Sequence, residues 1–121
     1  MRKIMIVDDN YLSAEGIEKN IDREVLNAEI VHICYNGTSA IDAMKKEPVD
    51  LIISDIEMPD LDGISMSRQA LDINPMVKII LISAYDKFEY ARRALLLGAL
   101  DYIEKPLDYA YLIQKVKMLL P

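Results

Sequence analysis

The sequence lacks several features that define common protein classes. Its single cysteine, Cys34, permits no internal disulfide framework and suits a reducing compartment such as the cytosol. Its longest apolar run, residues 94–100, is far shorter than the roughly 18 residues that a membrane-spanning helix needs. Residues 1–3 resemble the start of a signal peptide, but Asp8 and Asp9 end the apolar stretch after four residues. These absences predict a cytoplasmic protein with no membrane segment.

The chain also has little positive charge, glycine or proline. Its 14 Lys and Arg are outnumbered by 20 Asp and Glu, which gives a formal net charge of −6. That charge argues against a nucleic-acid or anionic-membrane surface as the main function of the segment. No internal repeat, linker or low-complexity tract interrupts the 121 residues. A chain of this length forms one domain that buries about two-thirds of its unfolded surface, so it can build a core without disulfides.

Short β-branched runs alternate with longer segments of helical period along the whole chain. The runs predict five strands, at residues 3–7, 29–34, 51–54, 77–82 and 101–104. Residues 4–7, 51–53 and 79–82 are apolar at every position. This pattern is typical of parallel strands that helices cover on both faces.

Five segments between or after these strands have the spacing of amphipathic helices. Four carry apolar stripes: Ala14, Ile17 and Ile21; Ala40, Ile41 and Met44; Ile64 and Leu71 after the turn at 60–63; and Leu112, Val116 and Leu119 after the turn at 106–108. The remaining segment opens with Asp86 and Glu89, a capping-box variant, and ends at Gly98. Five strand-then-helix units with right-handed crossovers predict an α/β fold with a doubly wound parallel sheet.

Polar and charged residues gather where the predicted strands end. In an open α/β sheet, ligands bind beyond the carboxyl ends of the strands. Four of the five strands deliver such residues to that edge: Asp8 and Asp9 after the first, Asp55 after the third, Ser83 after the fourth, and Lys105 and Pro106 after the fifth. A plain surface would scatter them over both edges, so the sequence predicts a functional site here.

Three carboxylates at one edge require a cation. Two like charges about 5 Å apart repel by about 3 kcal/mol at an effective dielectric of about 20, which a metal ion or Lys105 would relieve. Carboxylate ligands suit Mg²⁺ or Mn²⁺, whereas zinc is disfavoured without cysteine or histidine nearby. A carboxylate beside a hard cation, a hydroxyl and a lysine is a phosphoryl-acceptor arrangement. In it Asp55 attacks phosphorus, Lys105 neutralises the phosphoryl oxygens, and Ser83 hydrogen-bonds one of them.

These motifs resemble the receiver domain of two-component response regulators. The resemblance rests on residues 7–9, on 54–63 around Asp55, on Ser83 with Ala84 and on Lys105 with Pro106, and it spans residues 1–121 as one receiver domain. It implies a flavodoxin-like, three-layer fold with strand order 2-1-3-4-5 and five helices. It also implies that a sensor histidine kinase supplies the phosphoryl group. Such a domain is a phosphoryl acceptor with self-phosphorylation and self-dephosphorylation, not a conventional enzyme.

The resemblance further implies a metal site. Mg²⁺, or Mn²⁺ in its place, is bound directly by the carboxylates of Asp9 and Asp55 and partly through water by Asp8. The backbone carbonyl of Glu57 completes the set of protein ligands. The Glu57 side chain and Tyr85 lie two residues beyond Asp55 and Ser83, at positions the family uses to set the lifetime of the phosphoryl group.

A switch is implied as well. Lys105 contacts the phosphoryl group, and the Lys105–Pro106 peptide bond is cis. Ser83 moves toward the phosphoryl group while Tyr102 rotates inward behind it. These movements change the surface made by the fourth helix, the fifth strand and the fifth helix, where a phosphorylation-dependent homodimer forms.

Residues 83–91 resemble receivers attached to AraC-type DNA-binding domains. We therefore expect transcriptional output through a DNA-binding domain absent from this segment, with no nucleic-acid or membrane contact by the receiver itself. A stand-alone receiver that acts by protein–protein interaction is the alternative.

Other interpretations compete for the same residues. Asp8 could cap the first helix, and Asp55 could belong to an aspartate-nucleophile phosphatase of the haloacid-dehalogenase type. A flavodoxin-like FMN binder would need a phosphate cradle where the acidic pair after the first strand lies. His32 is interpreted as structural or exposed and Cys34 as a small buried hydrophobe. Tyr109 and Tyr111 are expected on the solvated surface of the last helix, a surface that self-association could also use.

Overall fold

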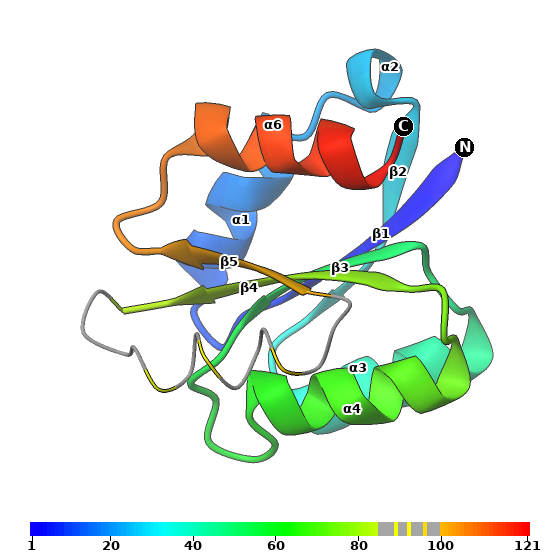
Figure 1. Ribbon diagram of the computed structural model, residues 1–121, viewed down its shortest axis with the longest axis vertical. Coiled ribbons are helices and arrows are strands. Elements are labelled where there is room, and N and C mark those ends of the chain that lie inside the picture. The colour runs from blue at the N-terminus through cyan, green and yellow to red at the C-terminus, as the bar shows by residue number, and fades with distance from the viewer. Residues whose placement is uncertain (85–88, 90–91, 93–95, 97–99) are drawn as a thin grey trace.

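A computed structural model describes residues 1–84, 89, 92, 96 and 100–121. Five parallel strands form one sheet in the order β2-β1-β3-β4-β5 (Figure 1). Their bounds are β1 Arg2–Val7, β2 Ala28–Cys34, β3 Leu51–Asp55, β4 Lys78–Ser83 and β5 Leu100–Glu104. The predicted doubly wound fold and strand order are confirmed, and each strand lies within one residue of its predicted bounds.

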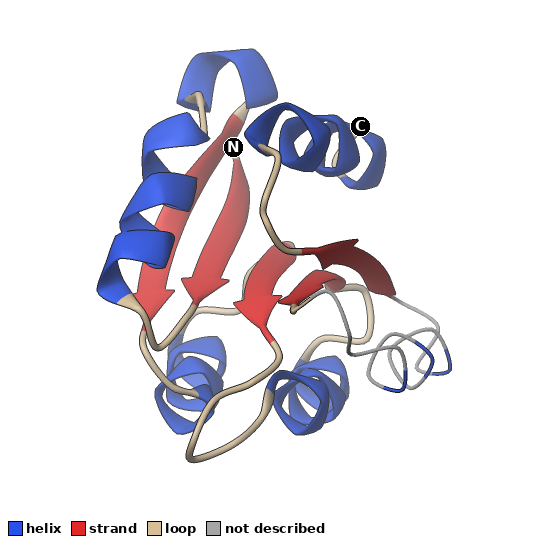
Figure 2. Cartoon of the chain, turned by 90° about the vertical axis from the view of Figure 1, so that its left-hand side faces the viewer, coloured by secondary structure: helices blue, strands red, loops and turns tan. Residues whose placement is uncertain are grey.

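Helices cover both faces of the sheet. Those that the structure describes are α1 Tyr11–Asn20, α2 Arg23–Leu26, α3 Gly37–Lys46, α4 Gly63–Ile73 and α6 Tyr109–Leu119. Helices α1 and α6 lie on one face and α3 and α4 on the other, which gives three layers (Figures 1 and 2). The predicted helix from Asp86 to Gly98 falls largely outside the described residues. Among the described residues, none of the helices combines the length and the apolar character needed to cross a membrane.

The sheet separates two apolar cores because successive strand side chains point to opposite faces. Along β1, Ile4 and Ile6 join the core under α1 and α6, while Met5 and Val7 join the core under α3 and α4. All four side chains are fully buried. The uninterrupted apolar runs in the sequence therefore reflect burial on both faces.

The sequence did not reveal α2, a single turn between α1 and β2. Asp22 caps it by accepting hydrogen bonds from the N–H groups of Glu24 and Val25. The turn ends at Asn27, whose φ of 49° lies in the left-handed region that asparagine tolerates better than most residues. Four residues are too few to show a helical period, so the pattern of apolar spacing could not predict this element.

The last helix packs more closely on α1 than expected. Tyr109 is half-buried against the core under α1 and α6, so its predicted place on the solvated surface is wrong. A Cβ atom on Gly16 of α1 would overlap the Tyr109 hydroxyl. Tyr111 is 43% exposed, in agreement with the prediction for that residue. The absence of a side chain at Gly16 thus gives the Tyr109 ring its place.

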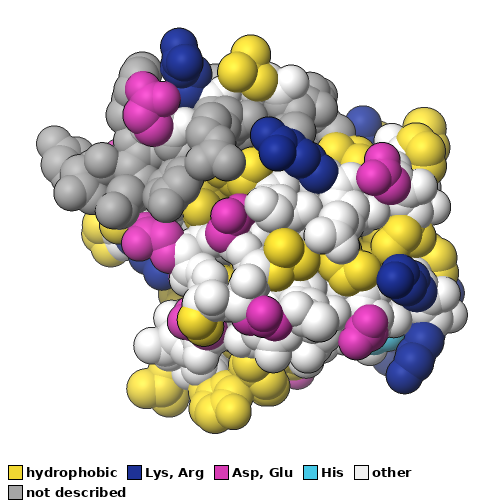
Figure 3. All heavy atoms as spheres, turned by 90° about the horizontal axis from the view of Figure 1, so that it is seen from below, with side chains coloured by type: hydrophobic (Ala, Val, Ile, Leu, Met, Phe, Trp, Pro, Cys, Tyr) yellow, Lys and Arg dark blue, Asp and Glu magenta, His cyan; other side chains and the backbone are white. Residues whose placement is uncertain are grey.

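The face formed by α3 and α4 carries interspersed charges. In the described part of that face, acidic and basic side chains alternate over the surface with scattered hydrophobic ones (Figure 3). A nucleic-acid surface would instead gather Lys and Arg into one patch or stripe. The described part of this face does not have that character.

Candidate functional site

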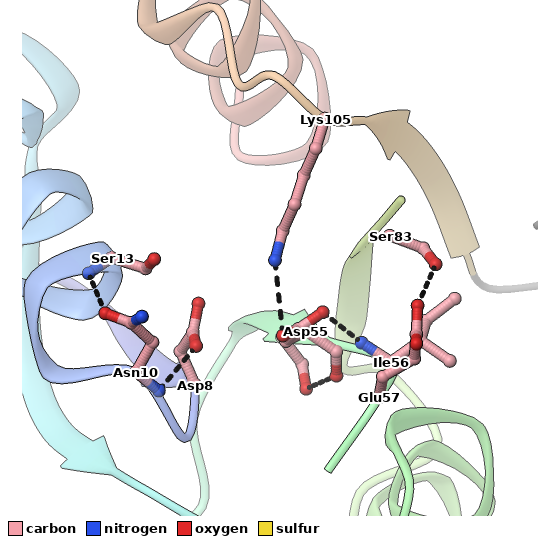
Figure 4. Close-up of polar contacts among 9 residues, drawn as sticks. Asp8, Asn10, Ser13, Asp55, Ile56, Glu57, Ser83 and Lys105 are labelled. Carbon is pink, nitrogen blue, oxygen red and sulfur yellow. Dashed lines mark hydrogen bonds and ion pairs between the residues drawn. The ribbon is translucent and has the colours of Figure 1, made fainter. Parts of the chain in front are cut away.

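The first strand ends in two acids that differ in exposure. Asp8 is 3% exposed, whereas Asp9 is exposed. The Asp8 carboxylate Oδ1 accepts a hydrogen bond from the N–H of Asn10 at 2.9 Å. The cap of α1 is Asn10 itself, whose side-chain oxygen accepts from the N–H of Ser13 at 3.0 Å (Figure 4). The interpretation of Asp8 as the helix cap is therefore wrong, and its carboxylate is available to the site.

Asp55 is the last residue of β3 and is 6% exposed. Its Oδ1 accepts a hydrogen bond from the N–H of Ile56 at 2.9 Å. Its Oδ2 faces the Lys105 ammonium at 3.4 Å (Figure 4). Lys105 follows β5, so two strand ends that are 50 positions apart in the chain meet at this contact.

The loop between β3 and α4 fixes the backbone of Asp55. Asp62 caps α4 by accepting from the N–H groups of Ile64 and Ser65 at 2.9 and 2.8 Å. The N–H of Gly63 donates to the carbonyl of Ile56 at 2.8 Å. A Cβ on Gly63 would overlap the carbonyl oxygen of Asp55, so glycine is what allows the start of α4 to lie against the end of β3.

The three acids form one group. Carboxylate oxygens of Asp8, Asp9 and Asp55 all lie within 4.8 Å of one another. Burial raises the pKa of the Asp8 carboxyl, and the nearby Asp55 adds to the increase. Burial also raises the pKa of Asp55, and Lys105 opposes this increase through its charge and its hydrogen bond. The site therefore holds more negative charge than its lysine balances, and its donors are the hard oxygen ligands that Mg²⁺ prefers.

Ser83 lies at the end of β4 and is fully buried. Its hydroxyl donates a hydrogen bond to Glu57 Oε1 at 3.3 Å (Figure 4). Its carbonyl accepts the N–H of Lys105 at 2.8 Å, and the Lys105–Pro106 peptide bond is cis. The sequence analysis gave the Glu57 backbone a metal-binding role and its side chain an influence on the lifetime of the phosphoryl group. It did not predict this contact, since no spacing rule relates residues 26 positions apart.

Tyr102 lies on β5 opposite Leu81 of β4. Its side chain is half-buried and packs against the core under α3 and α4. Its N–H donates to the Asp101 carboxylate at 2.9 Å. Tyr102 therefore packs in the core, on the strand that leads to Lys105.

A cavity of about 230 Å³ opens beside the acids. Asp8 and Lys105 form polar parts of its wall, and Ile17, Leu107 and Tyr109 form apolar parts. It lies where α1 approaches the loop between β5 and α6. The sequence analysis missed this hollow because it depends on how two helices pack. Of the predicted site residues, the structure brings together Asp8, Asp9, Asp55 and Lys105, with Ser83 adjacent through Glu57.

His32 and Cys34 both occupy structural positions on β2. His32 is half-buried on β2, and its Nε2 lies 3.0 Å from the carbonyl oxygen of Glu47, the residue that ends α3. It is structural, as predicted. Cys34 is 8% exposed and burial raises the pKa of its thiol, so it is the buried hydrophobe that the sequence predicted.

Comparisons with known proteins agree with this geometry. The family model for the response regulator receiver domain matches residues 4–117. The chain is 32% identical over 120 residues to the chemotaxis protein CheY of Treponema pallidum, covering 98% of this chain and 82% of that protein. It spans 32%, 49% and 44% of the length of three other curated relatives, two of which are transcriptional regulatory proteins.

Two solved structures are similar throughout. The REC domain of AraT, a response regulator from Geobacillus stearothermophilus, matches with a TM-score of 0.91 and 33% identity, covering 98% of this chain and 92% of that one. A two-component transcriptional regulator AraC from Clostridium phytofermentans matches with a TM-score of 0.91 and 30% identity over the same shares. These similarities favour a receiver over the phosphatase and the flavin binder.

Proposed function

The chain belongs to the response regulator receiver domain family of two-component systems, and we propose that it accepts a phosphoryl group on Asp55 in a Mg²⁺-dependent reaction. The observation that carries the proposal is the group of three acids beside Lys105. Such a group is electrostatically unfavourable by itself and favourable around a divalent cation and a phosphoryl group.

The proposed metal ligands are those that the family resemblance implies, and the grouping of the three acids supports them. Asp9 and Asp55 would hold Mg²⁺ through their carboxylates, Asp8 partly through water, and Glu57 through its backbone carbonyl. When bound, the ion supplies positive charge that stabilises the phosphoryl oxygens during transfer. Mn²⁺ has the same preference for oxygen ligands and would serve in its place.

Asp55 is the nucleophile in this proposal. Its carboxylate oxygen forms a bond to phosphorus as the bond from phosphorus to the donor breaks, and the donor leaves with that electron pair. The N–H of Ile56 fixes the orientation of the carboxylate through Oδ1. Lys105, at 3.4 Å from Oδ2, balances the charge that the new phosphoryl oxygens bring.

Ser83 and Tyr102 transmit the change. Ser83 would donate a hydrogen bond to a phosphoryl oxygen, and Tyr102 would rotate inward behind it. The surface around β5 and α6, together with the predicted helix from Asp86 to Gly98, would then change shape and support a homodimer. The phosphoryl donor would be a sensor histidine kinase, and the location cytoplasmic.

The output is transcriptional in this proposal, through a DNA-binding domain outside the segment. It is supported by the similarity to two-component transcriptional regulators. The similarity to CheY, of which the chain covers 82%, supports the alternative of a stand-alone receiver that acts through protein contacts. Immunodetection of the protein in cell extract separates the two, because a fused DNA-binding domain would increase the size of the polypeptide well beyond 13.8 kDa.

The test is the intact mass of the protein after incubation with acetyl phosphate and Mg²⁺. We expect the gain of one phosphoryl group, which EDTA prevents and Asp55→Asn abolishes. Asp72→Asn is the matched control, since it removes an exposed acid of α4 away from the site and should gain the same mass. An equal gain in Asp55→Asn would refute the assignment of the acceptor.

A further inference from the structure

We propose that the Glu57 carboxylate is a positioning residue that holds the Ser83 hydroxyl in the unphosphorylated protein and competes for it with the phosphoryl group. This inference rests on the proposed function, in which Ser83 donates to a phosphoryl oxygen. It gives the Glu57 side chain a task distinct from the backbone carbonyl that would bind the metal.

The two residues reach each other from neighbouring strand ends. Glu57 lies two residues beyond Asp55, and Ser83 ends β4, whose Ile82 pairs with Asp55 in the sheet. The Ser83 hydroxyl is 3.3 Å from Glu57 Oε1 (Figure 4). Because Ser83 is fully buried, its hydroxyl needs an acceptor within the protein, and Glu57 provides one.

The Ser83 hydroxyl has a single proton to donate, so a well-aligned bond to Glu57 and a well-aligned bond to a phosphoryl oxygen on Asp55 compete for it. The bond to Glu57, at 3.3 Å, is longer than an ideal hydroxyl–carboxylate bond. Phosphorylation would replace it by a bond to a phosphoryl oxygen, so the bond to Glu57 opposes the switch.

The difference in exposure decides which partner moves. Glu57 is exposed and can turn into water, where its carboxylate is fully solvated. Ser83 is held by β4 and by its carbonyl bond to the N–H of Lys105. A rotation of the Glu57 side chain thus breaks the contact, after which the Ser83 hydroxyl turns toward the phosphoryl group. This makes the contact a reversible latch.

Charge alone would also oppose phosphorylation, because Glu57 adds a negative group near Asp55. The two effects separate in a double-mutant cycle of wild type, Glu57→Ala, Ser83→Ala and the double variant. Repulsion by Glu57 persists when the Ser83 hydroxyl is removed, whereas competition for the hydroxyl disappears. Glu57 is exposed, so its replacement should leave the thermal unfolding midpoint unchanged and the variant folded.

The experiment is a titration with beryllium fluoride, a phosphoryl mimic, at fixed Mg²⁺, followed by amide NMR. We expect Glu57→Ala to lower the half-saturating concentration of beryllium fluoride in both backgrounds. The decrease should be about threefold to tenfold larger when Ser83 is present than in Ser83→Ala, which corresponds to the free energy of one net hydrogen bond. Ser83→Thr, which keeps a hydroxyl, should retain the effect. Asp72→Asn, which changes an exposed acid of α4 away from the site, should act equally in both backgrounds.

Equal effects of Glu57→Ala in the two backgrounds would overturn the latch while leaving the proposed function intact. A wild-type protein with no saturable response to beryllium fluoride and Mg²⁺ would overturn both. The expected result requires a response in the wild type and a coupling that depends on the Ser83 hydroxyl.

Discussion

The two rims of the sheet both carry acidic and basic side chains. Their charges are balanced at the rim where the strands begin and unbalanced at the rim where they end. At the rim where the strands begin, Lys3 pairs with Glu47 at 2.9 Å and Arg2 lies 3.8 Å from Asp50, with all four side chains in contact with solvent. At the rim where the strands end, Asp8, Asp9 and Asp55 lie beside Lys105, whose Nζ is 3.4 Å from Asp55 Oδ2.

The pKa shifts follow that contrast. Lys3 lowers the pKa of Glu47 through its hydrogen bond and charge, which is the behaviour of a satisfied surface pair. Burial raises the pKa of Asp8 and of Asp55, because desolvation disfavours the charged carboxylates and the nearby Lys105 opposes this increase without cancelling it. The comparison teaches that acidic residues indicate a functional site where nearby basic side chains do not balance their charge. The number of acidic residues alone does not indicate one.

The largest expected effect is on metal binding at the unbalanced rim. Asp9→Ala should weaken Mg²⁺ binding about 100-fold or more, because it removes one of two direct carboxylate ligands. Asp50→Ala at the opposite rim should leave the affinity unchanged. Isothermal titration of each variant with Mg²⁺ measures both values. The same affinity in wild type and Asp9→Ala would show that the metal site lies elsewhere.

The backbone beneath Asp55 gives the next effect. Gly63→Ala should lower the free energy of unfolding by about 1–3 kcal/mol, because the added Cβ overlaps the Asp55 carbonyl and backbone must shift. Gly16→Ala is the matched control, since its Cβ meets only the end of the Tyr109 side chain, which can rotate away. Urea unfolding compares the two, and a Gly63→Ala protein as stable as Gly16→Ala would contradict the packing described.

Neutralising a buried acid should stabilise the metal-free protein. Asp8→Asn is expected to raise the free energy of unfolding by about 1 kcal/mol in EDTA at neutral pH, because it removes a desolvated charge beside Asp55. Since folding raises the pKa of Asp8, wild-type stability falls as pH rises through the interval between the unfolded and folded pKa values. The gain should therefore shrink as pH falls toward about 4. Unfolding curves at several pH values test this, and a destabilised variant at neutral pH would refute it.

A substitution at the balanced rim should have the smallest effect on stability, and it should destabilise the protein where Asp8→Asn stabilises it. Glu47→Gln is expected to lower the urea midpoint slightly at neutral pH, because it removes the partner of Lys3. Since Lys3 lowers the pKa of Glu47, that stability is present above the ordinary pKa and is lost as pH falls through the lowered one. High salt should abolish the difference. A stabilised Glu47→Gln protein would remove the contrast between the rims.

Much of the fold was readable from the sequence because burial on both faces leaves an unmistakable pattern. Runs such as residues 79–82 predict a parallel strand from apolar character alone, and their ends locate Asp55, Ser83 and Lys105 at one rim. The strand order came from the family resemblance, since periodicity does not specify which strands are neighbours.

The parts that could not be predicted depend on packing. The half-buried place of Tyr109 requires a close approach of α1 and α6 at Gly16, which no local pattern encodes. The contact of Ser83 with Glu57 joins the end of β4 to the loop after β3, and the sheet register sets the distance between them. Asp8 was one possible cap for α1, but the structure has Asn10 as the cap. Both residues have capping side chains, and only the geometry selects one.

The most direct test of the central claim locates the phosphoryl group chemically. Protein treated with acetyl phosphate and Mg²⁺ is reduced with borohydride, which converts an aspartyl phosphate into homoserine, and its peptides are sequenced by mass spectrometry. The account predicts homoserine at position 55 and nowhere else. Homoserine at position 8 or 9, or a phosphoester that survives on Ser83, would contradict it.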